Sequence, residues 1–146
     1  MKKIAYIQAA WHTDVTDNCK AAFVEEMALH EVSDDNIEFF SVPGSLEIPL
    51  MAQKLAQTGR YGAVCCSGLV VDGGIYRHEF VAQSVISGIV QVSLETGVPV
   101  LSAVLTPQQF HEGSDVHVEF FRVHMLTKGK ELADACMGIL KSLDAT

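Results

Sequence analysis

The sequence predicts an α/β fold, a three-layer α/β/α sandwich around a four-stranded parallel sheet. Short apolar runs of strand length, without clean alternation, are typical of strands that are covered on both faces. Segments with apolar residues at helical spacing follow these runs in the order β-α-β-α-β-α-β-α. With right-handed crossovers, this order produces a parallel sheet between two helix layers.

The N-terminal third supplies the first two strands and the helix between them. We expect the first strand at residues 4–10 and the second at residues 37–42, because both are short apolar runs. Apolar residues then recur at helical spacing up to about residue 30. Thr13 or Asp14 is a suitable N-cap for this first helix.

The middle of the chain continues the alternation. A second helix is predicted around Pro49, which fits the first turn of a helix because its missing N–H costs little there. The third strand is expected at residues 63–71 and the next helix at residues 77–96, where Gly97 ends it. The fourth strand is predicted at residues 99–105.

The C-terminal part is less regular. Residues 106–118 are interpreted as a polar loop or a short helix, residues 120–126 are ambiguous, and a final helix is predicted over residues 127–143. No linker, repeat or low-complexity segment divides the sequence. We therefore expect one domain over residues 1–146, with the flavodoxin-like strand order.

Composition narrows the classes of function. Hydrophobic residues make up 49% of the chain and charged residues 19%, which disfavours disorder. The formal net charge is −8 and no basic cluster occurs, so we expect no nucleic-acid partner. The N-terminal apolar run has only the length of a strand. We therefore expect neither a targeting segment nor a membrane partner.

The cysteine pattern indicates reduced, mostly buried thiols in a cytoplasmic protein. Cys65 and Cys66 are adjacent, and none of the four cysteines belongs to a C-x-x-C pair. The glycine-rich motifs that bind dinucleotides or ATP are also missing from the sequence.

Unusual residues follow the predicted strands, at the edge where open parallel sheets bind their ligands. They are Trp11 after the first strand, residues 43–47 after the second, residues 72–74 with Arg77 and His78 after the third, and Thr106 with Pro107 after the fourth. We therefore predict a ligand site at the carboxyl ends of the strands.

Each of these residues has a functional and a structural interpretation. Trp11 can stack on a flat heterocycle or serve as an ordinary core or interface residue. The turn at residues 44–47 can bind the edge of a polar ring or simply cap a helix. His78 is the best acid–base candidate and Arg77 can bind an anion, although a single histidine near a helix start is more often structural.

The C-terminal cations carry two further hypotheses. His111, His117 and His124 match no established metal spacing, and we expect no metal site. His117, Arg122, His124 and Lys128 can form a cationic patch for a phosphate or a solvated helix face. The residues alone leave these alternatives open.

Together these segments resemble the 6,7-dimethyl-8-ribityllumazine synthase family over nearly the whole chain. The specific matches are residues 42–49 (VPGSLEIP), the glycine turn that leads into residues 78–81 (HEFV), residues 98–101 with 105–106, and residues 128–131 (KGKE). Residues 71–81 and the tryptophan at position 11 look most like a divergent branch of the family whose members form decamers.

The resemblance implies a transferase of riboflavin biosynthesis. Its substrates would be 5-amino-6-(D-ribitylamino)uracil and 3,4-dihydroxy-2-butanone 4-phosphate, and its products 6,7-dimethyl-8-ribityllumazine, phosphate and water. It implies no metal or redox cofactor. It also implies a homo-oligomer, a pentamer or a dimer of pentamers, with each site between adjacent subunits.

The resemblance also implies roles for individual residues. Trp11 would stack on the pyrimidine, and Ser102 would approach it from the neighbouring side of the site. The ring edge and ribityl chain would contact Ser45, Leu46, Glu47, Leu69, Val70 and Val71. Gly74 and Ile75 would line the phosphate pocket, and phosphate would be bound by His117, Arg122, His124 or Lys128.

Two adjacent residues are candidates for the catalytic position that the resemblance implies. Ungapped alignment places Arg77 at the family's catalytic histidine and His78 one residue later. Because arginine stays charged, it is a poor proton donor. We therefore predict that His78 transfers protons, with Arg77 as an electrostatic helper.

Other functions of the same fold stay open at this point. The chain could be a non-catalytic module that binds riboflavin or lumazine, or an archaeal-type riboflavin synthase that turns over lumazine itself. A flavodoxin-like signalling protein is a further class, and the missing acidic phosphoacceptor cluster argues against a response regulator.

Overall fold

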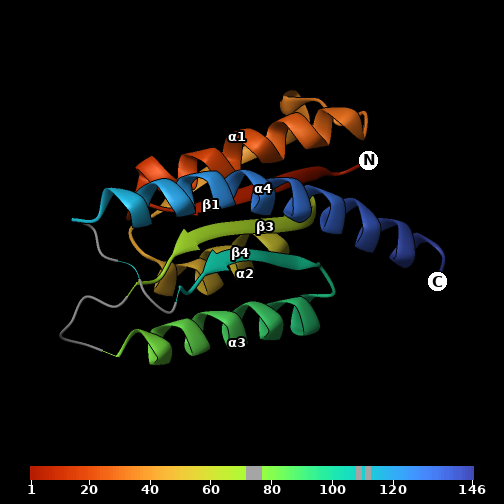
Figure 1. The fold of residues 1–146 in the computed structure, drawn as a ribbon. Coiled ribbons are helices and arrows are strands. Elements are labelled where there is room, and N and C mark those ends of the chain that lie inside the picture. Colours follow the sequence, from red (N-terminus) through yellow and green to blue (C-terminus); the bar gives the residue numbers. More distant parts are fainter. Residues whose placement is uncertain (72–76, 108–109, 111–112) are drawn as a thin grey trace.

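The computed structural model describes residues 1–71, 77–107, 110 and 113–146. Its strands and α-helices alternate along the chain (Figure 1). They are β1 (Lys3–Ala9), α1 (Thr13–Leu29), β2 (Ile37–Val42), α2 (Ile48–Gln57), β3 (Tyr61–Leu69), α3 (His78–Thr96), β4 (Val100–Leu105) and α4 (Asp115–Asp144), with short 3₁₀ helices at Asp34–Asn36 and Ser45–Glu47.

The four strands form one parallel sheet in the order β2-β1-β3-β4. Helices α1 and α4 cover one face and helices α2 and α3 the other (Figure 1). The predicted α/β sandwich and its flavodoxin-like strand order are therefore confirmed. Because all strands run in the same direction, their carboxyl ends meet at one edge.

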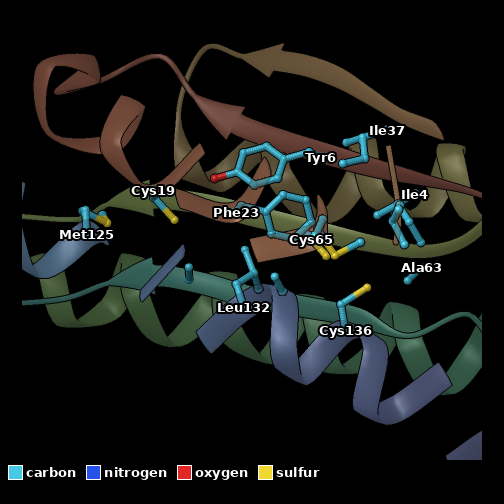
Figure 2. Close-up of a cluster of buried hydrophobic side chains, with 14 of the residues drawn as sticks. Ile4, Tyr6, Cys19, Phe23, Ile37, Ala63, Cys65, Met125, Leu132 and Cys136 are labelled. Carbon is cyan, nitrogen blue, oxygen red and sulfur yellow. The ribbon is translucent and has the colours of Figure 1, made fainter. Parts of the chain in front are cut away.

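The core under α1 and α4 is built from side chains of both helices and of β1 and β3 (Figure 2). Tyr6 and Phe23 lie at its centre, with ring centroids 4.9 Å apart. The other core, under α2 and α3, joins Ile7 and Val64 of the sheet to Ile48 and Val85 of the helices. Both sheet faces are buried, which explains why the strands show no alternation.

All four cysteines are buried and free, as predicted. Burial raises the pKa of the Cys19 thiol to about 11 and moves the pKa of Cys65 well above its ordinary value. Thiols with raised pKa values are poor nucleophiles at neutral pH, so Cys19 and Cys65 serve packing. The pKa of Cys136 is instead lowered, because its thiol hydrogen-bonds with that of Cys65.

Helix α4 begins much earlier than predicted. The sequence placed its start at residue 127, whereas the helix starts at Asp115, where the Ser114 hydroxyl accepts a hydrogen bond from the His117 N–H at 3.3 Å. Its first turns carry one apolar stripe that packs on the core and another that faces outward. Two stripes on one helix hide the helical period, and this explains the error.

The first helix also begins differently. Its N-cap is His12 and not Thr13 or Asp14, and the His12 side chain makes no capping hydrogen bond. The carbonyl oxygen of His12 instead accepts from the N–H groups of Val15 and Thr16 at 2.9 and 3.0 Å.

Among the described residues, no helix has the length and apolar character needed to span a bilayer.

Candidate active site at the carboxyl ends of the strands

A cavity of about 410 Å³ opens at the carboxyl ends of β1, β2 and β3. This volume lies in the range of small-molecule sites. Its lining is Trp11, His12, Gly44, Ser45, Leu46, Glu47, Leu69, Val70, Val71 and Val81. The structure therefore brings together seven of the residues to which the family resemblance gives contacts with the uracil substrate.

Trp11 and Glu47 approach each other across Gly44. A Cβ atom at Gly44 would lie 3.4 Å from Oε2 of Glu47 and 3.7 Å from Nε1 of Trp11. The Trp11 side chain is free to stack, because 66% of the residue is exposed. The missing side chain at Gly44 leaves a flat ring access to the indole, the carboxylate and the backbone at once.

The turn after β2 lies close against β3. Residues Ser45–Glu47 form a 3₁₀ turn, which the Glu47 N–H closes by donating to the Gly44 carbonyl at 3.2 Å. A Cβ atom at Gly68 would lie only 2.8 Å from the Ser45 hydroxyl oxygen. Glycine at position 68 therefore lets the turn approach the strand and positions Ser45 at the cavity.

His78 and Arg77 have different surroundings at the start of α3. His78 is the first residue of the helix, its side chain is only 13% exposed, and its Nδ1 lies 3.6 Å from Oε2 of Glu79. Val81, which lines the cavity, is three residues later and shares a face of α3 with His78. Arg77 precedes the helix and lies 5.8 Å from the centroid of the exposed Phe80 ring.

Neither His78 nor Arg77 is among the described residues that line the cavity, so their catalytic roles stay a prediction. Gly74 and Ile75, the predicted phosphate-pocket residues, lie outside the described residues, and so does His111.

Ser102 and Lys128 lie together elsewhere in the protomer. They line a second cavity of about 400 Å³ between the edge strand β4 and helix α4. Nζ of Lys128 lies 2.9 Å from Oε2 of Glu131, and this hydrogen-bonded ion pair lowers the pKa of Glu131. Neither Ser102 nor Lys128 lines the cavity of Trp11.

The remaining predicted phosphate residues are dispersed along the first half of α4. Arg122 pairs with Glu119 at 3.0 Å and approaches Asp14 at 3.8 Å. His124 stacks on Phe120, with ring centroids 5.9 Å apart. The backbone N–H of His117 serves the helix cap described above. Within one protomer these groups do not converge on Trp11.

The sequence interpretation missed His12 as a cavity residue. His12 lines the cavity beside Trp11, and its ring lies edge-on to Phe110, with centroids 5.4 Å apart. Its place directly after Trp11 at the carboxyl end of β1 was the available signal, because both residues leave the same strand.

Comparison with known proteins identifies the family of this chain. The family model described as 6,7-dimethyl-8-ribityllumazine synthase matches residues 1–144. The chain is 52% identical over 143 residues to 6,7-dimethyl-8-ribityllumazine synthase 2 of Bradyrhizobium diazoefficiens, covering 98% of this chain and 85% of that protein.

Two further relatives agree with this match. The 6,7-dimethyl-8-ribityllumazine synthase of Rhodococcus erythropolis is 49% identical, with 99% of this chain and 92% of that protein covered. The 6,7-dimethyl-8-ribityllumazine synthase 2 of Pseudomonas syringae pv. tomato is 51% identical, with 97% and 83% covered. The chain belongs to the 6,7-dimethyl-8-ribityllumazine synthase family.

Proposed function

We propose that this chain condenses 5-amino-6-(D-ribitylamino)uracil with 3,4-dihydroxy-2-butanone 4-phosphate. The uracil's 5-amino group attacks the ketone, and an imine forms as one water leaves. Phosphate is then eliminated, the adduct tautomerises, and the ribitylamino nitrogen closes the ring with loss of a second water. The product is 6,7-dimethyl-8-ribityllumazine, and the chain acts in the cytoplasm as one domain over residues 1–146.

The observation that carries this proposal is the meeting of Trp11 and Glu47 over Gly44. A pyrimidine stacked on the exposed indole would present its polar edge to the Glu47 carboxylate and to the backbone of the turn. The cavity of about 410 Å³ leaves room for the ribityl chain along Leu69, Val70 and Val71. Family membership supplies the identity of the substrates.

Holding two reactants together supplies much of the acceleration in this proposal. Correct positioning can be worth about 7–11 kcal/mol, because the reaction no longer depends on a chance encounter. Proton transfer typically adds about 10²–10⁴-fold. We assign that transfer to His78, with Arg77 as an electrostatic helper that stays charged.

The complete site is proposed to lie between two protomers. Ser102 and Lys128 line a separate cavity on the far edge of the sheet, at β4. A neighbouring copy that places its β4 edge over the Trp11 cavity would add Ser102 to the ring-binding side and Lys128 to the phosphate side. His117, Arg122 and His124 remain candidates for phosphate on the same helix as Lys128.

Two exposed apolar stripes support a homo-oligomer. Ile86, Val90 and Leu94 recur every fourth residue on α3 and are 38%, 51% and 81% exposed. Val116, Phe120 and Val123 form an outward stripe on α4. Unlike patches on one chain suit head-to-tail contacts, and these close into rings. We propose a pentamer, or a dimer of pentamers on the resemblance of residues 71–81.

Incubating the protein with both substrates tests the reaction directly. We expect lumazine fluorescence to appear together with an equal amount of phosphate. Tight riboflavin binding without product would instead favour a non-catalytic binding module. Conversion of added lumazine to riboflavin would favour an archaeal-type riboflavin synthase.

A further inference from the structure

We propose that His12 is a second acid–base residue of this site, one that transfers protons during imine formation. This inference rests on the proposed function. His12 lines the Trp11 cavity from the start of α1, whereas His78 begins α3 on the opposite face of the sheet. The cavity therefore receives a histidine from the start of α1 as well as Val81 from α3, the helix that His78 begins.

The backbone of His12 is unusual for the start of a helix. His12 adopts the left-handed conformation, with φ 57° and ψ 45°, which is unfavourable for a residue with a Cβ atom. N-cap residues usually have extended backbones and side chains that accept a hydrogen bond from the helix. His12 has neither property, so helix stability does not account for a histidine at this position.

Contacts of both the backbone and the ring maintain the conformation of His12. The His12 carbonyl oxygen accepts from the N–H groups of Val15 and Thr16 and from the Thr16 hydroxyl, at 2.9, 3.0 and 3.3 Å. The ring lies edge-on to Phe110, which is buried and contacts Phe121 of α4 at a centroid distance of 5.7 Å. A strained backbone that surrounding contacts maintain is typical of functional positions.

The chemistry of the cavity gives an imidazole a specific task. Imine formation moves protons from the attacking amine to the ketone oxygen, which leaves as water. His12 would accept one proton from the amine nitrogen as the C–N bond forms and pass it to the ketone oxygen, which gives a neutral carbinolamine. As the C–O bond breaks, the remaining N–H proton would reach the leaving hydroxyl group through the same imidazole, so one water leaves and the imidazole ends the step neutral. This exchange needs a group that both accepts and donates a proton, which an imidazole does, whereas the Trp11 indole can only donate.

Two substitutions separate this role from a structural one. His12→Asn keeps a residue that tolerates the left-handed conformation but cannot exchange protons near neutral pH. His12→Gly keeps the backbone freedom and leaves a space that free imidazole can enter. His30→Asn controls for the loss of a histidine far from the cavity, at the other end of α1, where the ring bonds to Asp134 of α4 at 2.8 Å.

The experiment measures steady-state formation of lumazine from both substrates, after circular dichroism and thermal melting confirm that each variant is folded. We expect His12→Asn to lower kcat about 10²-fold while KM changes little. Added imidazole should restore part of the kcat of His12→Gly, and His30→Asn should behave as wild type.

The outcomes are distinguishable. If wild-type protein forms no lumazine, the proposed function fails and the His12 inference fails with it. If the wild type is active and His12→Asn keeps its kcat, the inference alone is overturned. A raised KM with unchanged kcat, or a His12→Gly variant that imidazole does not rescue, also overturns it. If His12→Asn does not fold, the imidazole rescue of His12→Gly decides.

Discussion

Gly129 of α4 lies directly against the backbone carbonyl oxygen of Cys19 in α1. A Cβ atom at Gly129 would overlap that oxygen and would lie 2.9 Å from Cβ of Ala22. The two helices therefore cross at a point that only glycine permits. This close crossing also positions the first half of α4, where the Arg122 carbonyl accepts a hydrogen bond from Asn18 of α1 at 2.9 Å.

The crossing yields a stability prediction with an internal control. Gly129→Ala should lower the free energy of unfolding by about 1–3 kcal/mol, because the helices must separate to admit the methyl group. Gly138→Ala, nine residues later on the same helix, meets nothing within 4 Å and should stabilise the protein by about 0.5–1 kcal/mol. Chemical denaturation of both variants measures the difference. Equal effects at the two positions would refute the close crossing.

Gly68 provides a corresponding prediction for the site. Gly68→Ala should push the Ser45 hydroxyl away from its place beside β3, because the added Cβ would lie 2.8 Å from its oxygen. We expect a higher KM for the uracil substrate, with the fold retained. Gly62→Ala, on the same strand, makes only an ordinary contact at 3.6 Å and should leave KM unchanged. An unchanged KM in Gly68→Ala would argue against a role for Ser45 in binding.

The proposed acid–base role of His78 predicts different effects of substitutions at His78 and at Arg77. We expect His78→Ala to slow turnover by about 10²–10⁴-fold without abolishing it, since positioning of the substrates persists. Arg77→Gln should have a smaller effect, because its side chain is exposed beside Phe80. Single-turnover rates at saturating substrate measure both variants. Full activity in His78→Ala would show that the assignment is wrong.

Away from the candidate site, the contacts of Glu38 predict that the stability of the protein depends on pH. The Tyr61 hydroxyl donates to its carboxylate at 3.0 Å and Lys3 lies at 3.3 Å, so the pKa of Glu38 is lowered from 4.5. Because folding favours the ionised form, this group stabilises the protein above its ordinary pKa. The contribution disappears as pH falls through the lowered value.

Glu38→Gln should therefore melt at a lower temperature than wild type at pH 7, and the difference between the two melting temperatures should shrink as the pH falls below 4.5. Glu25→Gln, on the exposed side of α1, serves as the control and should follow wild type at every pH. A gap between Glu38→Gln and wild type that widens on acidification would contradict the assigned contacts.

Much of the fold was predictable because its strands and most helices have unambiguous patterns. The predicted second strand has the bounds of β2, and Gly97 ends α3 in the left-handed conformation with φ 74°. The start of α4 was not predictable, because outward apolar residues such as Phe120 and Val123 mask its core-facing stripe. In the proposed oligomer those residues contact a partner protomer, and a single sequence does not reveal such a contact.

The part of the candidate site that lies at the carboxyl ends of the strands was predictable. Trp11, Glu47 and Val70 follow different strands, and the parallel topology alone brings them to one cavity. Ser102 and Lys128 could not be placed in this way, because they line a cavity at the other edge of the sheet. His12 could have been predicted as a cavity residue from its place directly after Trp11, but its left-handed backbone conformation could not be predicted from the sequence.

Subunit mixing tests the shared site most directly. One variant combines Trp11→Ala with Glu47→Gln, and the other carries Lys128→Met, so each lacks one half of the proposed site. The two are co-expressed with different affinity tags, and mixed oligomers are purified through both tags. If each site takes one half from each of two neighbours, random mixing should restore about a quarter of wild-type lumazine formation. Activity no higher than the mean of the two separate variants would contradict a site shared between protomers.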